Sequence, residues 1–175
     1  NLDGSCPSES INDAKRKNKQ SNIFFVDENI FPQTLAVLKT RALPLGIEIK
    51  LVDPKNIIFN RNIFGFFVQL PNSSGELWNP TNQIESAHQV QVIAIASIDL
   101  LAQSLFAPVS SMGFDIAIGS SQRFGVPMGC GGPHAAFFAT KEQYKRQIPG
   151  RIVGKSVDCD GNPALRLALQ TREQH

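Results

Sequence analysis

The residues best placed to do chemistry gather in one glycine-rich stretch. Gly125–His134 contains four glycines and two prolines, a composition that neither a helix nor a central strand tolerates. It lies between two short apolar runs, Ile116–Ile118 and Ala135–Ala139, which we expect to be buried strands. Open α/β sheets bind their ligands in loops at such strand ends. The loop lacks the Gly-Lys-Ser/Thr ending of a P-loop. Its composition fits a turn cluster, a phosphate cradle or a loop packed under a partner, and favours a structural crossover over a binding role.

Cysteines and histidines indicate neither a metal site nor an activated thiol. Cys6, Cys130 and Cys159 lack metal-ligand spacing, so we expect free thiols in a reducing compartment. Cys130 lies in the glycine-rich loop without a visible partner base, and we interpret it as a small residue filling a turn. His88 and His134 have no neighbours at metal-ligand spacing either.

Composition narrows the class of protein. The chain has 175 residues, of which 42% are apolar and 18% charged, values typical of a globular domain. A net charge of +2 without a basic stripe argues against a nucleic-acid partner. Every apolar run is much shorter than the roughly 18 residues that a membrane-spanning helix needs, so we expect no membrane segment.

The elements expected to position the loop alternate between strands and helices, which predicts an α/β fold with a mostly parallel sheet. The six predicted strands lie near 23–26, 47–52, 64–70, 91–96, 114–118 and 135–139. Four helices are predicted at 32–41, 80–88, 100–106 and 141–147, the first with Asp27 as a candidate N-cap. Near the end, Asp160-Gly161 predicts a hairpin turn with a return strand at 165–169. The predicted organisation is a polar connector (1–22), a core domain (23–140) and a helix-turn and hairpin segment (141–175).

Several long strings resemble one family, the P-proteins of the glycine cleavage system, which are pyridoxal-phosphate-dependent glycine decarboxylases. The principal string is Ser-Ser-Gln-Arg-Phe-Gly-Val-Pro-Met-Gly-Cys-Gly-Gly-Pro-His at 120–134. Further matches are Phe-Pro-Gln-Thr-Leu-Ala-Val-Leu-Lys-Thr-Arg-Ala at 31–42, Lys-Arg-Gln-Ile-Pro-Gly-Arg-Ile-Val-Gly at 145–154 and the run at 164–175. The resemblance covers about 22–175. Because the chain begins without methionine and ends inside a matching run, we expect it to be a fragment.

The resemblance implies a particular half of that protein. P-proteins have two similar halves, each shaped like a fold-type-I pyridoxal enzyme, and this chain resembles part of the large domain of the N-terminal half. The C-terminal half carries the cofactor lysine in a His-Lys-Thr-Phe run. Aligning Phe124 with that phenylalanine places Gln122 at the lysine position. Since glutamine has no amine to form a Schiff base, the resemblance implies no catalytic residue here and a cofactor bound covalently outside this chain.

Six residues remain as candidates for binding or structure. Asp99 and His134 are the candidate cofactor contacts. For Asp99 the resemblance implies such a contact, because fold-type-I enzymes place an aspartate against the pyridine nitrogen at the end of this strand. We favour a structural role for Asp99, as the cap of the predicted helix after it. Structural or interface candidates are Arg123, Gly131, Gly132 and Arg151. Arg123 follows Gln122, and we expect its guanidinium to hold a carboxylate or a neighbouring segment.

The resemblance further implies glycine decarboxylation with transfer of the aminomethyl group to the lipoyl arm of the H-protein. It implies a dimeric assembly with the catalytic half or a second subunit, in the bacterial cytoplasm or the mitochondrial matrix. Two alternatives remain open, namely a self-contained fold-type-I lyase or transferase and a non-catalytic scaffold. For the former, only Lys155 lies near a glycine turn among the lysines.

Overall fold

The computed structural model describes residues 21–126, 129, 134–150 and 152–168. The chain divides into two compact units, Asn1–Ala139 and Thr140–His175. The first unit is built on a six-stranded sheet, and the second contains a two-stranded sheet.

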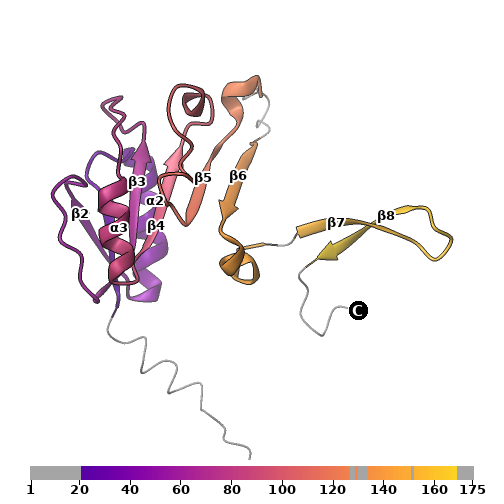
Figure 1. Ribbon diagram of the computed structural model, residues 1–175, viewed down its shortest axis with the longest axis horizontal. Helices are drawn as coiled ribbons and strands as arrows, with labels where there is room; N and C mark the ends of the chain where they lie inside the picture. Colours follow the sequence, from indigo (N-terminus) through magenta and orange to yellow (C-terminus); the bar gives the residue numbers. More distant parts are fainter. Residues whose placement is uncertain (1–20, 127–128, 130–133, 151, 169–175) are drawn as a thin grey trace, which may run out of the picture. The chain divides into compact units, whose positions relative to one another are not determined.

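The large sheet has the strand order β2-β1-β3-β4-β5-β6. The strands are β1 (Ile23–Asp27), β2 (Glu48–Val52), β3 (Ile63–Leu70), β4 (Ile93–Ile98), β5 (Ile116–Ser120) and β6 (Ala136–Thr140). The pairs that join β1 to β5 are all parallel, and β6 runs in the opposite direction at the edge (Figure 1). The predicted α/β class with a mostly parallel sheet is confirmed, and each strand begins within two residues of its predicted position.

Two helices cover opposite faces of this sheet. Helix α3 (Thr81–Gln89) buries Ile84 in a cluster with Phe66, whereas α2 (Pro32–Ala42) packs Leu35 against a cluster that contains Phe67. Consecutive side chains of a strand point to opposite faces, and Figure 1 shows β3 between the two helices. Strand β3 reads as a nearly continuous apolar run because both of its faces are covered.

Three local predictions were wrong. The predicted helix at 100–106 is only a 3₁₀ turn, η3 (Ala102–Ser104). Leu100 and Phe106 pack against the core, but Leu101 and Leu105 are 40% and 83% exposed, so this segment gains little of the tertiary packing that would stabilise a longer helix. The N-cap position of helix α2 is occupied by Phe31, which makes no side-chain capping bond. The carboxylate of Asp27 instead accepts a bond from the Asn29 amide at 2.8 Å.

The second unit contains the remaining correction and the predicted hairpin. The segment expected to be an α-helix at 141–147 is a 3₁₀ helix, η5 (Glu142–Gln147). Strands β7 (Ile152–Val157) and β8 (Pro163–Ala168) pair antiparallel, as the Asp160-Gly161 signal predicted. Asp158 organises the turn by accepting bonds from the Asp160 and Asn162 amides at 2.9 and 2.8 Å. Over the part of the chain that the structure describes, no helix is both long and apolar enough to cross a bilayer.

Candidate functional site

A pocket of about 520 Å³ opens over the carboxyl ends of the central strands. The parallel direction of β1 to β5 brings these strand ends to one edge of the sheet, the position at which open α/β sheets bind ligands. Side chains that follow distant strands therefore meet there. The polar side chains that line the pocket include Gln69, Asn72, Asp99, Gln122 and Arg123.

Asp99 and Arg123 form an ion pair on the wall of this pocket. Asp99 directly follows β4, and Arg123 lies in the 3₁₀ turn η4 (Gln122–Phe124). The Asp99 Oδ2 atom is 3.0 Å from Arg123 Nη1, while its Oδ1 accepts a bond from the Leu101 amide at 2.9 Å. The carboxylate therefore caps the turn after β4 and fixes an arginine from the loop after β5. The Asp99 side chain is 19% exposed and that of Arg123 is 64% exposed.

Gln122 and His134 also meet, at the two ends of the glycine-rich loop. Gln122 Nε2 lies 3.2 Å from His134 Nδ1. Nearby, the Ser121 amide donates to the Ala135 carbonyl at 2.9 Å, and Ser120 Oγ donates to the same carbonyl at 3.1 Å. These contacts hold the ends of the loop together. The two candidates Gly131 and Gly132 lie outside the described residues, as do Cys130 and Arg151.

Gln69 supplies a buried polar group at the base of the pocket. This residue is 4% exposed, and its Oε1 atom has no hydrogen-bond partner among the described residues. Such a group costs free energy when it stays unpaired, so it is an unusual feature of a folded core. Sequence reasoning missed this residue, although a glutamine near the end of the apolar run 63–70 was an available signal.

Asp27 lies next to Gln69, and its carboxyl group is fully buried at the end of β1. Burial raises the pKa of Asp27, and hydrogen bonds from the Asn29 and Gln69 backbone amides offset that shift only in part. The neighbouring charges of Glu28 and Asp53 raise the pKa further. Asp27 therefore holds its proton more tightly in the folded protein than in the unfolded chain.

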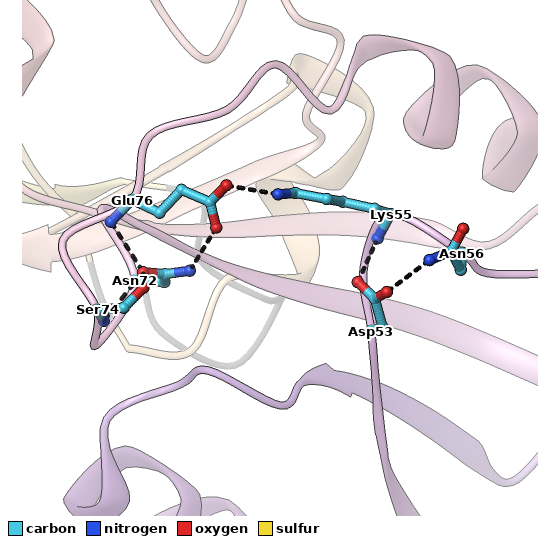
Figure 2. Close-up of polar contacts among 6 residues, drawn as sticks. All are labelled: Asp53, Lys55, Asn56, Asn72, Ser74 and Glu76. Atoms are coloured by element: carbon cyan, nitrogen blue, oxygen red, sulfur yellow. Dashed lines mark hydrogen bonds and ion pairs between the residues drawn. The ribbon is translucent and has the colours of Figure 1, made fainter.

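A polar network shapes the loop that follows β3 (Figure 2). Asn72 is buried, and its Oδ1 accepts bonds from the Ser74 hydroxyl at 2.7 Å and the Glu76 amide at 3.0 Å. Glu76 in turn binds Lys55 Nζ at 2.5 Å, and the backbone amide of Lys55 donates to Asp53 at 3.0 Å. The network ties the loop after β2 to the loop after β3, so one rim of the pocket is preorganised.

The opposite, amino edge of the sheet holds a second acidic contact. Asp115 immediately precedes β5 and is 4% exposed. Its Oδ2 accepts a bond from the Ala94 amide at 2.9 Å and lies 2.8 Å from His88 Nε2. His88 belongs to the last turn of α3, so this contact attaches the end of the helix to two strands.

The pocket does not fit a cofactor held by a Schiff base. Among the described residues that line it there is no lysine, and a Schiff base requires an amine. Metal chemistry has no support either, because no group of three histidine, cysteine or acidic residues in the described ranges could hold an ion. The chain offers charged and amide groups there for non-covalent binding.

Comparisons with known proteins give a consistent family. The family model for the glycine cleavage system P-protein matches residues 2–175. The chain is 63% identical over 156 residues to a glycine dehydrogenase (decarboxylating) of Synechococcus sp. (strain CC9902), covering 89% of this chain and 16% of the relative. It is 49% identical over 174 residues to the enzyme of the same name from Aliivibrio fischeri (strain MJ11), covering 99% of this chain and 18% of the relative. The chain thus spans less than a fifth of the length of these curated relatives.

Solved structures support the same fold. A crystal structure of an inhibitor-bound glycine decarboxylase (P-protein) of the glycine cleavage system matches with a TM-score of 0.77 and 32% identity, covering 91% of this chain and 37% of that one. A cystathionine gamma-lyase from Lactobacillus plantarum matches with a TM-score of 0.58 but 13% identity, covering 76% of this chain and 36% of that one. The second likeness concerns the fold alone.

Proposed function

Because this chain belongs to the glycine cleavage system P-protein family, we propose that it is part of an enzyme that decarboxylates glycine. In the proposed reaction glycine loses its carboxyl group as carbon dioxide, and its aminomethyl group passes to the lipoyl arm of the H-protein. Pyridoxal phosphate supplies an electron sink for such a reaction when it is bound. The proposal rests on the family, since this chain spans only a small part of its relatives.

Within that enzyme, we assign this chain to the half that does not hold the cofactor covalently. The observation that carries this assignment is the glutamine at position 122, on the wall of a pocket whose described lining contains no lysine. Gln122 lies 3.2 Å from His134 and cannot replace the amine of a lysine. The cofactor lysine then belongs to the other half of the enzyme.

The contribution of this half is to scaffold the catalytic half and to complete a dimeric assembly. The hydrogen bonds around Asn72 and the Asp99–Arg123 pair connect the loops at the carboxyl edge of the sheet, which supports a structural role for this half. The partners proposed are the catalytic half, in the same polypeptide or as a second subunit, and the lipoylated H-protein. The location proposed is the cytoplasm of a bacterium or the mitochondrial matrix of a eukaryote.

The activity can be tested on a purified full-length P-protein that carries this sequence. We expect it to exchange the carboxyl group of glycine with labelled bicarbonate when pyridoxal phosphate and lipoylated H-protein are present. L-Alanine and L-serine as alternative substrates serve as controls for specificity. No exchange with glycine, under conditions in which the cofactor is bound, would contradict the proposed activity.

A further inference from the structure

The pocket at the carboxyl edge presents one negative and one positive group side by side. Asp99 and Arg123 are 3.0 Å apart at their closest atoms. Only Nη1 of the guanidinium contacts Asp99 in the described structure, and the arginine side chain is 64% exposed. Its remaining donors therefore face solvent at the mouth of the pocket, where a carboxylate could bind two of them at once.

The base of the pocket adds a second, independent indication of a ligand. Gln69 lines the pocket and is 4% exposed, yet its Oε1 atom has no partner among the described residues. Buried polar groups are normally hydrogen-bonded, and an exception calls for an explanation such as an absent ligand or water. An amide whose oxygen is not held can turn to offer either a donor or an acceptor to a molecule above it.

Charge selects the class of that molecule. A lone anion would be attracted by Arg123 but repelled by Asp99, and a lone cation would meet the reverse. A zwitterion avoids both penalties when its carboxylate faces Arg123 and its ammonium group faces Asp99. An α-amino acid carries its ammonium and carboxylate on one carbon, which matches the short separation of the pair. The pocket volume of about 520 Å³ also falls within the usual range for small-molecule sites.

We propose that this pocket, in the half that lacks the cofactor lysine, binds a small α-amino acid as its zwitterion. The ligand carboxylate binds the free donors of Arg123, and its ammonium binds the carboxylate of Asp99. Gln69 supplies a third polar contact from below. This is a non-covalent site additional to the catalytic one. The choice of glycine as the probe rests on the proposed function, whereas the site itself does not.

The test uses full-length P-protein carrying this sequence, with its cofactor fixed to the catalytic lysine by borohydride reduction. Glycine binding is then measured by equilibrium dialysis, and we expect one saturable site that depends on this pocket. Arg123→Gln and Asp99→Asn should each weaken binding about tenfold or more, because each removes a charged hydrogen-bonding partner. Asparagine keeps the oxygen that caps the turn after β4, so the fold is retained. Arg123→Lys should restore part of the affinity.

Two controls make the result specific. Arg61 is an exposed arginine outside the pocket lining, and Arg61→Gln should leave glycine binding unchanged. Acetate and methylamine each carry only one of the two charges, and each should bind about tenfold more weakly than glycine. Absence of saturable glycine binding, or equal binding by Arg123→Gln and the unmodified protein, would overturn the proposal. Acetate binding as tight as glycine would also overturn it, by indicating a site for anions. Failure of the proposed function would appear separately, as missing exchange activity in the unreduced enzyme.

Discussion

Two aspartates lie at opposite edges of one sheet, and they differ in burial and in the groups that they contact. Asp115 precedes β5 and is 4% exposed, with its carboxylate engaged by the Ala94 amide and His88. Asp99 follows β4, is 19% exposed and lines a pocket together with Arg123. The amino edge is a closed packing contact, whereas the carboxyl edge keeps charged groups accessible. The arrangement of the partners and the access of solvent, rather than the presence of a carboxylate, therefore separate a structural aspartate from a candidate binding residue.

The largest expected loss of stability comes from removing the buried carboxylate of Asp115 at the amino edge of the sheet. Asp115→Ala would leave the buried Ala94 amide without its acceptor and would release His88 at the end of α3. We expect a loss of about 2–4 kcal/mol in the free energy of unfolding, in the range for breaking a buried polar contact. Urea denaturation followed by circular dichroism measures it. A loss no greater than that of Asp99→Ala would mean that the two edges do not differ in this way.

A somewhat smaller effect is expected where the backbone beneath the pocket is tight. A Cβ on Gly119 would lie 2.3 Å from the Ile98 carbonyl oxygen and 2.6 Å from the Phe137 ring. Because the backbone cannot move aside freely, Gly119→Ala should lower stability by about 1–3 kcal/mol. Gly129→Ala is the matched control, since a Cβ on Gly129 would meet no other atom of the described structure within 4 Å. Equal urea midpoints for the two variants would show that the strands around Gly119 adapt.

Removal of the Asp99 carboxylate at the carboxyl edge should lower the stability by less. Asp99→Ala loses the cap on the Leu101 amide and the partly exposed ion pair with Arg123, and we expect a loss of about 1 kcal/mol. Asp99→Asn keeps the cap oxygen and should recover most of that loss. The thermal midpoints of both variants, compared with the unmodified protein, test this. Equal losses for alanine and asparagine would assign the stability to the charge rather than to the cap.

The smallest change in the free energy of unfolding is expected for Asp27→Asn. Asparagine keeps the acceptor for the Asn29 amide and removes only the charge. The pKa of Asp27 is raised from its usual 3.8 by burial. Its contribution to stability is therefore fully present below pH 3.8 and is lost as the pH rises through the raised pKa. The Asp27→Asn side chain cannot ionise. As the pH rises through this window, the free energy of unfolding should therefore fall less for Asp27→Asn than for the unmodified protein. Parallel curves of unfolding free energy against pH would contradict the assignment.

Sequence patterns were sufficient to predict the strands of the large sheet, because apolar runs are typical of buried parallel strands. They placed β4 slightly early, since Gln91 adopts a positive φ of 64° in the turn before the strand. They also predicted a helix at 100–106, although Leu101 and Leu105 are 40% and 83% exposed. Burial depends on tertiary packing, which local periodicity does not encode.

The candidate site was predictable only in part for the same reason. The glycine-rich loop and Arg123 could be singled out from the sequence itself, and Asp99 from the family resemblance. The cap by Asp99 follows from its position before a turn. The ion pair between Asp99 and Arg123 joins loops after different strands, and the orphaned amide of Gln69 depends on what packs around it. Neither has a local signature, because each arises from contacts between segments that are distant in the sequence.

The central claim, that this half does not hold the cofactor covalently, has one direct test. Full-length P-protein carrying this sequence is loaded with pyridoxal phosphate, reduced with borohydride, digested and mapped by mass spectrometry. We predict that the stoichiometric label lies on a lysine outside these 175 residues. A stoichiometric label on any lysine of this sequence, Lys155 included, would contradict the account and would identify this chain as a cofactor-bearing domain.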